Sequence, residues 1–186
     1  MALRAWRLTL VLVPAALALG CFDLEMPERA EAECVDPEAD VCWQKSSSAE
    51  QMDWSQAMSY CDGMGLGGYA WHLPSIDELR SFVEECDWTE PGGGCGVEEG
   101  CLQSSCCDSD ACTPIECEAW GGPAYPAGCY WQDGALGQCG CYWSSSEWTD
   151  YSGNAWVLNY SNASISGLDK YSMCYVRCLA DYGGGE

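Results

Sequence analysis

The sequence predicts an α+β domain in which two helices pack on an antiparallel sheet and a long disulfide-rich insert interrupts the chain. Apolar residues recur with helical spacing over residues 53–64 and 75–85, and they alternate with a period of two over residues 155–160 and 174–179. The insert is predicted because ten of the 16 cysteines lie within residues 84–141.

The first twenty residues have the composition of a secretory signal peptide. Arg4 and Arg7 form a short positive region, and an apolar run follows from Leu8 to Leu19. About 12 apolar residues are too few to cross a hydrocarbon layer of ~30 Å as a lasting helix. We therefore expect residues 1–20 to be cleaved and the protein to be exported.

Cys21 directly follows Leu-Ala-Leu-Gly, an order that resembles the lipoprotein box of bacteria, in which the cysteine carries a diacylglycerol. The alternative is an ordinary signal peptide followed by an unrelated cysteine. Residues 21–40 are rich in Glu, Pro and Ala, which is typical of a solvated tether. We thus expect an anchor at Cys21, a tether, one domain over residues 41–180 and a flexible tail over residues 181–186.

This organisation predicts an outer-membrane or cell-surface lipoprotein of a bacterium. Its contact with the membrane would be through the lipid anchor alone. A periplasmic or secreted soluble protein is the alternative location.

The chain is strongly acidic, with 29 Asp and Glu against 7 Lys and Arg and a formal net charge of −22. Such a surface repels nucleic acid and anionic lipid headgroups, so both are excluded as expected partners. Cations, basic proteins and neutral sugars are the expected partners. Because no Lys, Arg or His occurs between Arg80 and Lys170, this span is expected to present an acidic face. Solubility and colloidal repulsion would explain the same composition.

Each helix ahead of the insert is predicted to begin at a capping box. Asp53 with Gln56 marks the first helix, and its apolar stripe ends in a stretch rich in glycine, beginning at Gly63. Ser75 with Glu78 marks the second helix, whose apolar residues fall on one face. Both helices are therefore expected to pack that face on the sheet.

Downstream of the insert the sequence predicts strands, because residues 155–160 and 174–179 alternate between two faces. Ser161-Asn162 is expected to form a tight turn into a short strand at residues 164–166. Residues 41–44 are expected to form a strand ahead of the first helix. The first and last strands of the sheet would then come from opposite ends of the domain.

The cysteines of the insert predict disulfides, because an exported protein folds in an oxidising compartment. The insert contains only four aliphatic residues, namely Val97, Leu102, Ile115 and Leu136. These are too few for a core of its own, so disulfides of about 2–4 kcal/mol each would replace burial. If Cys21 is lipidated, 15 thiols remain and one is unpaired, whereas 16 thiols can form eight pairs.

A zinc cluster is the alternative to disulfides in the insert. Its candidate ligands are Cys106, Cys107, Cys112 and Cys117. Their spacing does not match a paired zinc ribbon, and no histidine lies near them. We therefore favour disulfides.

Several short motifs follow one another in a defined order along the chain. They are Val41-Cys42-Trp43-Gln44-Lys45, Met58-Ser59-Tyr60-Cys61, Gly67-Gly68-Tyr69, Trp71-His72-Leu73-Pro74, Asp77-Glu78-Leu79-Arg80, Tyr142-Trp143-Ser144-Ser145-Ser146, Asn154-Ala155-Trp156 and Tyr175-Val176-Arg177-Cys178. In this order they resemble the Lcl C-terminal domain family, which is named for the terminal module of a bacterial collagen-like adhesin. The resemblance covers residues 41–83 and 142–179 and leaves residues 84–141 outside it.

The fold of that family is similar to C-type lectin-like and formylglycine-generating-enzyme-like domains. The resemblance therefore implies a surface-exposed module that binds glycans or proteins, with the insert at the place where lectin-like folds display variable loops. It also implies that Cys61 pairs with Cys178, and both cysteines fall on predicted apolar faces. Cys141 with Cys174 is expected as a second bridge within the sheet.

No cofactor is expected, because the motifs for calcium-dependent sugar binding are absent. Where C-type lectins use a Glu-Pro-Asn type loop and a Trp-Asn-Asp strand motif, this chain has Glu90-Pro91-Gly92 and Asn154-Ala155-Trp156. The carboxylates of Asp133, Asp150 and Asp169 are the weak candidates for a structural calcium ion, provided that the fold brings them together.

We expect no catalytic residues. His72 is the only histidine and is expected to pack or cap near the start of the second helix. Cys174 and Cys178 invite comparison with the cysteine pair of formylglycine-generating enzymes. The Arg-Gly-Gly-Ser-Trp type segment of those enzymes is absent here, which favours structural bridges.

Exposed aromatic side chains are the remaining indication of function, because their planes stack on sugar rings and anchor protein interfaces. Trp143 and Trp156 are expected in the core, since both lie on strands. The expected ligand-binding residues are Trp120, Tyr125, Trp131 and Trp148. The sequence thus predicts a non-catalytic adhesion module for a glycan or surface protein. The alternatives are a structural envelope component without a ligand and, least favoured, an oxidase related to formylglycine chemistry.

Overall fold

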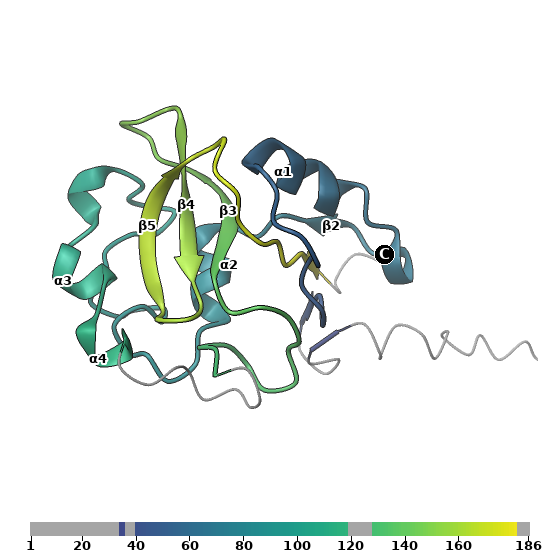
Figure 1. Ribbon diagram of the computed structural model, residues 1–186, viewed down its shortest axis with the longest axis horizontal. Coiled ribbons are helices and arrows are strands. Elements are labelled where there is room, and N and C mark those ends of the chain that lie inside the picture. Colours follow the sequence, from purple (N-terminus) through teal and green to yellow (C-terminus); the bar gives the residue numbers. More distant parts are fainter. Residues whose placement is uncertain (1–33, 36–39, 119–127, 182–186) are drawn as a thin grey trace, which may run out of the picture.

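The computed structural model describes residues 34–35, 40–118 and 128–181 (Figure 1). The signal segment, Cys21, Trp120, Tyr125 and the predicted tail after residue 181 lie outside the described residues, as does most of the tether. The fold is α+β, as predicted, but its strands form two three-stranded antiparallel sheets where a single sheet was predicted. Seven disulfides lie among the described residues.

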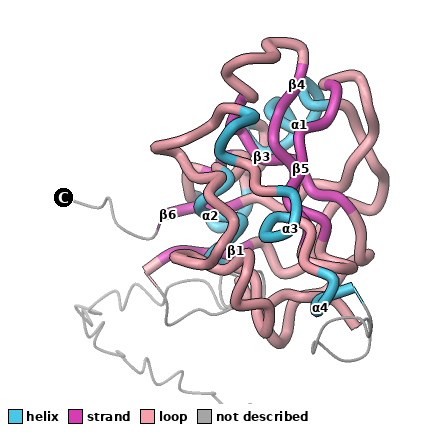
Figure 2. The backbone as a smooth tube through the Cα atoms, turned by 90° about the vertical axis from the view of Figure 1, so that its left-hand side faces the viewer, coloured by secondary structure: helices cyan, strands magenta, loops and turns pink. Residues whose placement is uncertain are grey.

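One sheet joins the two ends of the domain, as predicted. Its strands are β1 (Val41–Trp43), β6 (Leu179–Asp181) and β2 (Trp71–His72), in the spatial order β1-β6-β2. β6 pairs antiparallel with both neighbours, so Cys42 and Trp71 lie opposite Ala180 on its two sides. Figure 2 shows β1 and β6 side by side. The first strand therefore needs the last one as its partner.

The other sheet is a meander formed by the chain after the insert. Its strands are β3 (Cys141–Glu147), β4 (Asn154–Asn159) and β5 (Ser164–Asp169). The predicted turn between β4 and β5 is present, and Ala163 in it adopts a φ of 54°. β5 runs three residues longer than predicted, because pairing with β4 continues through Gly167 and Leu168, where the apolar alternation has ended.

Both predicted capping boxes are present. In α1 (Trp54–Asp62), Gln56 N–H donates to Asp53 Oδ1 over 2.8 Å and Asp53 N–H donates to Gln56 Oε1 over 3.1 Å. α1 ends at Gly63, as expected from its glycines. Helix α2 (Ile76–Ser81) is shorter than predicted and is capped by Phe82. Glu85, the predicted last residue, has a φ of 62° that no right-handed helix includes.

The predicted strand over residues 174–178 is wrong. This segment forms isolated bridges with Met52 and Tyr142, and regular pairing begins only at Leu179. Its backbone N–H groups find other acceptors: that of Val176 donates to Ser48 Oγ, and that of Cys178 donates to Gln44 Oε1. Side chains therefore take the place of a neighbouring strand.

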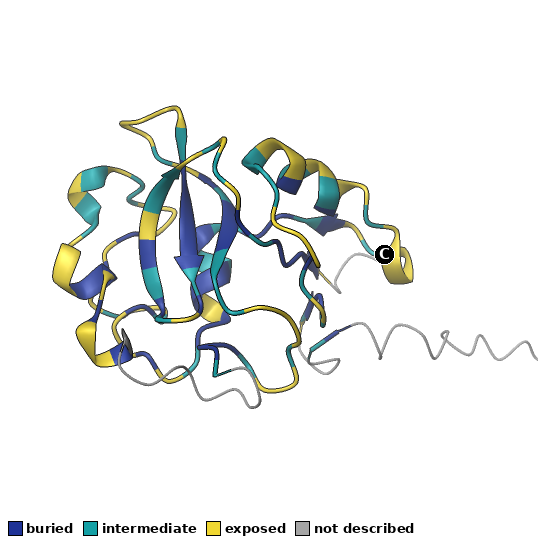
Figure 3. Ribbon diagram, in the orientation of Figure 1, coloured by how far each residue is buried: buried dark blue, intermediate teal, exposed yellow. Residues whose placement is uncertain are grey.

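The described part of the insert packs on the same core as α2 and β4. Its short helices are η2 (Ser104–Cys106), α3 (Ser109–Cys112) and α4 (Ile115–Glu118), and η1 (Leu66–Gly68) precedes it. Val97, Tyr130 and Trp131 are buried in the same cluster as Phe82 and Trp156. Figure 3 shows the outer turns of α3 and α4 exposed around this buried centre.

Seven disulfides join 14 of the cysteines. They are Cys34–Cys42, Cys61–Cys178, Cys86–Cys117, Cys95–Cys112, Cys101–Cys106, Cys129–Cys139 and Cys141–Cys174. Cys61–Cys178 and Cys141–Cys174 are the two pairs that the family resemblance implies. Cys107 is free, and burial and the neighbouring Asp108 raise the pKa of its thiol.

The disulfides indicate an exported protein, because such bonds persist in oxidising compartments. None of the helices in the described part of the chain has the length and apolar composition that a membrane crossing needs.

Candidate ligand-binding site

Two disulfides of the insert enclose a covalent ring. Cys86–Cys117 and Cys95–Cys112 join the loop over residues 86–95 to the segment over residues 112–117, so the two segments and the two bridges form one closed circuit. All four sulfur-bearing residues are buried. The outward-facing side chains of both segments are thereby held in fixed relation.

A cavity of about 260 Å³ opens at this ring. Its lining residues are Trp88, Asp110, Thr113, Ile115 and Glu116. We call this cavity the Trp88 cleft. Trp88 belongs to the loop over residues 86–95, and Thr113, Ile115 and Glu116 belong to the segment over residues 112–117. Asp110 lies two positions before Cys112.

Trp88 is held by the glycine-rich loop that follows it. Cys95 N–H donates to the Trp88 carbonyl over 2.9 Å, and Gly93 N–H donates to the Glu90 carbonyl over 2.9 Å. A Cβ at Gly93 would collide with the backbone carbonyl of Trp88, so only glycine allows this close approach. The indole lies over Gly94 and remains 43% exposed.

The opposite wall is set by α3 and the start of α4. Asp108 caps α3 by accepting the N–H groups of Asp110 and Ala111. Because Ala111 and Cys112 point inward, the neighbouring Asp110 and Thr113 face solvent. Ile115 is 77% exposed and gives the cleft an aliphatic surface.

The cleft carries carboxylates without a cationic partner. The two salt bridges within the described residues are His72–Glu78 and Lys170–Glu147, so Asp110 takes part in neither. Glu116 likewise has no Lys, Arg or His partner among the described residues. The wall therefore combines an aromatic face, an aliphatic side chain and two negative charges.

A second, smaller cavity of about 180 Å³ lies beside the same loop and is lined by Asp77, Arg80, Pro91, Gly92 and Glu98. Arg80 is buried and already donates to the carbonyls of Thr89, Glu90 and Val97 over 2.9, 2.8 and 2.6 Å. Its guanidinium thus fastens the loop to α2. Burial lowers the pKa of Arg80, against the opposing effect of Asp77 and Glu98.

The prediction that Trp131 is a surface residue is wrong, because its side chain is fully buried. Its ring lies 4.7 Å from the guanidinium of Arg177 and 5.5 Å from the ring of Tyr160. The insert contains only four aliphatic residues, and this tryptophan helps to fill the core beside Val97.

Trp148 is half-buried and does not present a free plane. It stacks on Trp156 with 4.9 Å between ring centroids, and its other neighbours are Tyr151 and Gly167. The structure therefore does not bring Trp131 and Trp148 together into one site. Trp143 and Trp156 lie in the core, as predicted.

The three candidate calcium ligands, Asp133, Asp150 and Asp169, each have different neighbours. Asp150 accepts the backbone N–H of Ser104 over 2.9 Å, and hydrogen bonding from Ser104 lowers its pKa. Asp169 accepts the backbone N–H of Tyr171 over 2.8 Å, and Asp133 lies near Glu84, whose pKa is raised chiefly by burial. In the parts of the chain that the structure describes, no three His, Cys, Asp or Glu side chains converge on a metal site.

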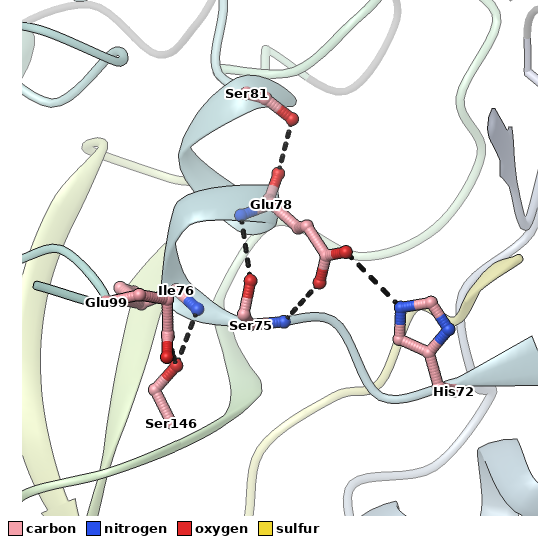
Figure 4. Close-up of polar contacts among 7 residues, drawn as sticks. All are labelled: His72, Ser75, Ile76, Glu78, Ser81, Glu99 and Ser146. Atoms are coloured by element: carbon pink, nitrogen blue, oxygen red, sulfur yellow. Dashed lines mark hydrogen bonds and ion pairs between the residues drawn. The ribbon is translucent and has the colours of Figure 1, made fainter. Parts of the chain in front are cut away.

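His72 supports the start of α2, close to its predicted role (Figure 4). Glu78 accepts the N–H of Ser75 over 2.6 Å and lies 3.4 Å from His72 Nε2. The hydrogen bond to Glu78 raises the pKa of His72, although burial opposes it. For Glu78, burial raises the pKa, but the bonds from His72 and Ser75 outweigh it and lower the pKa.

Nearby, Ile76 N–H donates to Ser146 Oγ over 2.8 Å, and Ser146 contacts Glu99 of the insert. These bonds join α2, β3 and the insert. They give the polar side chain of Ser146, which belongs to one of the family motifs, a structural role.

The sequence did not single out Trp88, although it lies among the aromatic residues of the insert. Only the pairing of the four cysteines places Trp88 across from Thr113, Ile115 and Glu116. The available signal was its position between Cys86 and Cys95, which the sequence alone cannot connect to their partners.

The profile of the Lcl C-terminal domain family matches residues 33–180. The matched range spans the insert, which the motif resemblance left outside. A search of curated proteins found none that matches the chain. Since the profile spans most of the 186 residues, the chain belongs to the Lcl C-terminal domain family.

Proposed function

We propose that this chain is a non-catalytic binding module with a C-type lectin-like fold, which engages a glycan or a protein at the Trp88 cleft. One observation carries the proposal: a cavity with a tryptophan that is 43% exposed is braced on both sides by buried disulfides. Exposed aromatic side chains in fixed positions are favoured at binding sites, because little flexibility is lost on binding.

We further propose that the module is displayed on a bacterial cell surface by a lipid on Cys21. The Leu-Ala-Leu-Gly-Cys order and the acidic tether support this location. In Figure 1 α3 and α4 of the insert lie on the left, and β2 and the start of the described domain lie on the right. A tether at residue 40 would therefore leave the Trp88 cleft facing away from the membrane.

The disulfide pattern supports a non-catalytic role. Cys174 is bonded to Cys141 and Cys178 is bonded to Cys61, so neither is a free thiol of the kind that formylglycine chemistry would require. His72 is committed to the start of α2. We therefore rank the oxidase alternative last.

Binding is tested with the exported domain on a glycan array and by pull-down of cell-surface proteins. Trp88→Ala should abolish whichever interaction is found, whereas Tyr171→Ala, which removes a side chain that is 89% exposed, should leave it intact. A wild-type domain that binds nothing saturably would favour the structural envelope component. Intact mass of the membrane-extracted protein tests the lipid on Cys21.

A further inference from the structure

We infer that the Trp88 cleft takes the cationic side chain of a lysine or arginine on a basic partner protein. This inference rests on the proposed function, since it names the ligand class of the same site. It is carried by the chemistry of the cleft wall, by the charge of the surrounding surface and by the size of the cavity.

The charged groups of the wall can only accept hydrogen bonds. Asp110 and Glu116 present four carboxylate oxygens, and the lining includes no Lys, Arg or His. A sugar hydroxyl can donate to these oxygens, but it is neutral and leaves both negative charges uncompensated. Ammonium and guanidinium groups donate only, which makes them the complementary ligands.

The aromatic face favours the same ligand. A tryptophan ring attracts a cation more strongly than other aromatic rings do, because the negative face of its π-system points at the charge. Trp88 packs over Gly94 on the inner side and is 43% exposed, so a face of the indole remains open to solvent. Ile115, which is 77% exposed, can cover the methylene stem of the incoming side chain.

The surrounding surface carries few positive charges that could compete. Of the four Lys and Arg within the described residues, Arg80 and Arg177 are buried, and Lys170 is paired with Glu147. Lys45 lies outside the insert. The field around the cleft is therefore negative and steers a basic partner toward it.

The cavity is of a size for one side chain. Its 260 Å³ lies just below the range of about 300–1,000 Å³ that is typical of pockets for drug-sized molecules. The two disulfides hold both walls before the ligand arrives, so binding costs little ordering of the cleft.

The inference is tested by NMR titration of the Trp88 indole N–H in the exported domain at low ionic strength. The probes are the peptide acetyl-Ala-Lys-Ala-Lys-Ala-amide, the same peptide with both lysines acetylated, and the neutral sugar chitotriose. We expect the lysine peptide to shift the Trp88 signal saturably. Acetylation should remove the shift, because it removes the charge.

Two matched pairs of variants locate the binding. The isosteric double variant Asp110→Asn/Glu116→Gln should weaken the lysine peptide about tenfold, and Trp88→Ala should weaken it about fivefold to thirtyfold. Affinities of all variants are measured by isothermal titration calorimetry, because Trp88→Ala removes the NMR signal. Glu50→Gln/Asp62→Asn is the control, because it also removes one Asp and one Glu charge, in α1 and just before it. Since α1 lies on the other side of the molecule in Figure 1, this variant should change affinity by less than about twofold. Tyr171→Ala is the control for loss of an aromatic residue.

Different results separate the two proposals. If chitotriose shifts the Trp88 signal and the lysine peptide does not, the cationic ligand is wrong and the binding site stands. Equal weakening by both double variants would reduce the effect to general charge attraction and overturn the inference. If Trp88→Ala also leaves every array and pull-down interaction intact, the proposed function fails as well. If Trp88→Ala misfolds, the inference is tested by the affinity of the double variant Asp110→Asn/Glu116→Gln for the lysine peptide.

Discussion

Arg177 is a buried cation that no carboxylate neutralises among the described residues. Its guanidinium donates to the carbonyls of Gln44, Lys45 and Leu136 over 2.5, 2.8 and 2.9 Å. The central carbon of the guanidinium also lies 4.7 Å from the centroid of the Trp131 ring. Burial lowers the pKa of Arg177, yet a guanidinium stays charged in proteins. Carbonyl dipoles and aromatic faces thus replace the water that it lost.

We predict that Arg177→Lys lowers the free energy of unfolding by about 2–4 kcal/mol. An ammonium group cannot reach carbonyls on two separate segments, and it does not stack on an indole. The measurement is urea denaturation, with Lys170→Arg as the control that exchanges the same residue types at a partly exposed position. A loss below about 0.5 kcal/mol would show that the guanidinium geometry is unimportant.

We predict that Gly167→Ala destabilises the domain by about 1–3 kcal/mol. The added methyl group would collide with the ring of Trp148, which also stacks on Trp156. Near-UV circular dichroism and thermal unfolding measure the effect. Gly153→Ala is the control, because a Cβ there meets no atom within 4 Å. Equal stability of the two variants would contradict close packing of Trp148 on β5.

For individual residues, the sequence predicted burial correctly on the strands but not in the insert. Trp156 was expected in the core because it lies on an alternating strand, and it is there. Trp131 carries no such pattern in a loop of cysteines and glycines, so its burial depends on Arg177 and Tyr160, which come from distant parts of the chain. Periodicity cannot report such contacts.

Among the elements, the helices depend on capping more than on length. α2 spans only Ile76–Ser81, too short to be stable alone, and its first turn is fixed by Ser75, Glu78 and His72. The capping boxes were predicted because both partners are close in sequence. The end of α2 was not, since it is set by tertiary packing of Phe82 and by the backbone at Glu85.

The His72–Glu78 contact should make stability depend on pH. The pKa of His72 is raised above its usual 6.5, so its contribution is fully present below pH 6.5 and is lost as the pH rises through the higher folded value. The pKa of Glu78 is lowered from its usual 4.5, so its contribution is lost as the pH falls through that lower value.

We therefore predict that His72→Gln costs more stability at about pH 5.5 than at about pH 8. Because both groups are more than one third exposed, we expect the difference to be below about 1 kcal/mol. Urea denaturation of both proteins at the two pH values measures it. The same cost at both values, or a larger one at high pH, would mean that the ring acts only through packing. Gln56→Ala, which weakens the α1 cap, should show no such pH dependence.

For the whole molecule, the disulfide between Cys61 and Cys178 closes the longest loop, with a sequence separation of 117. The family resemblance implied this pair, and the paired ends of the domain show why it can form. The connectivity of the insert could not be predicted, because many pairings satisfy the same sequence. That gap is also why the Trp88 cleft was missed.

We predict that Cys61→Ala/Cys178→Ala lowers the free energy of unfolding by about 5 kcal/mol, in a chain-entropy estimate for a loop of this length. Removing Cys101–Cys106, whose separation is 5, should cost only about 2 kcal/mol. Denaturation of both double variants makes the comparison. If the short loop costs as much as the long one, local strain and packing outweigh loop entropy.

The same bond has a mechanical consequence. β1 and β6 lie antiparallel at the two ends of the domain, so tension on both ends would peel them apart one residue pair at a time. The pull would then reach the Cys61–Cys178 bridge, which shields everything between these residues from the load. Stretching would free only the flanking segments, about 80 Å of chain at ~3.5 Å per residue. Without the bridge about 250 Å would be freed, because Cys86–Cys117, Cys129–Cys139 and Cys141–Cys174 would still hold their own loops. Tension applied to both ends of the domain would therefore leave the Trp88 cleft intact.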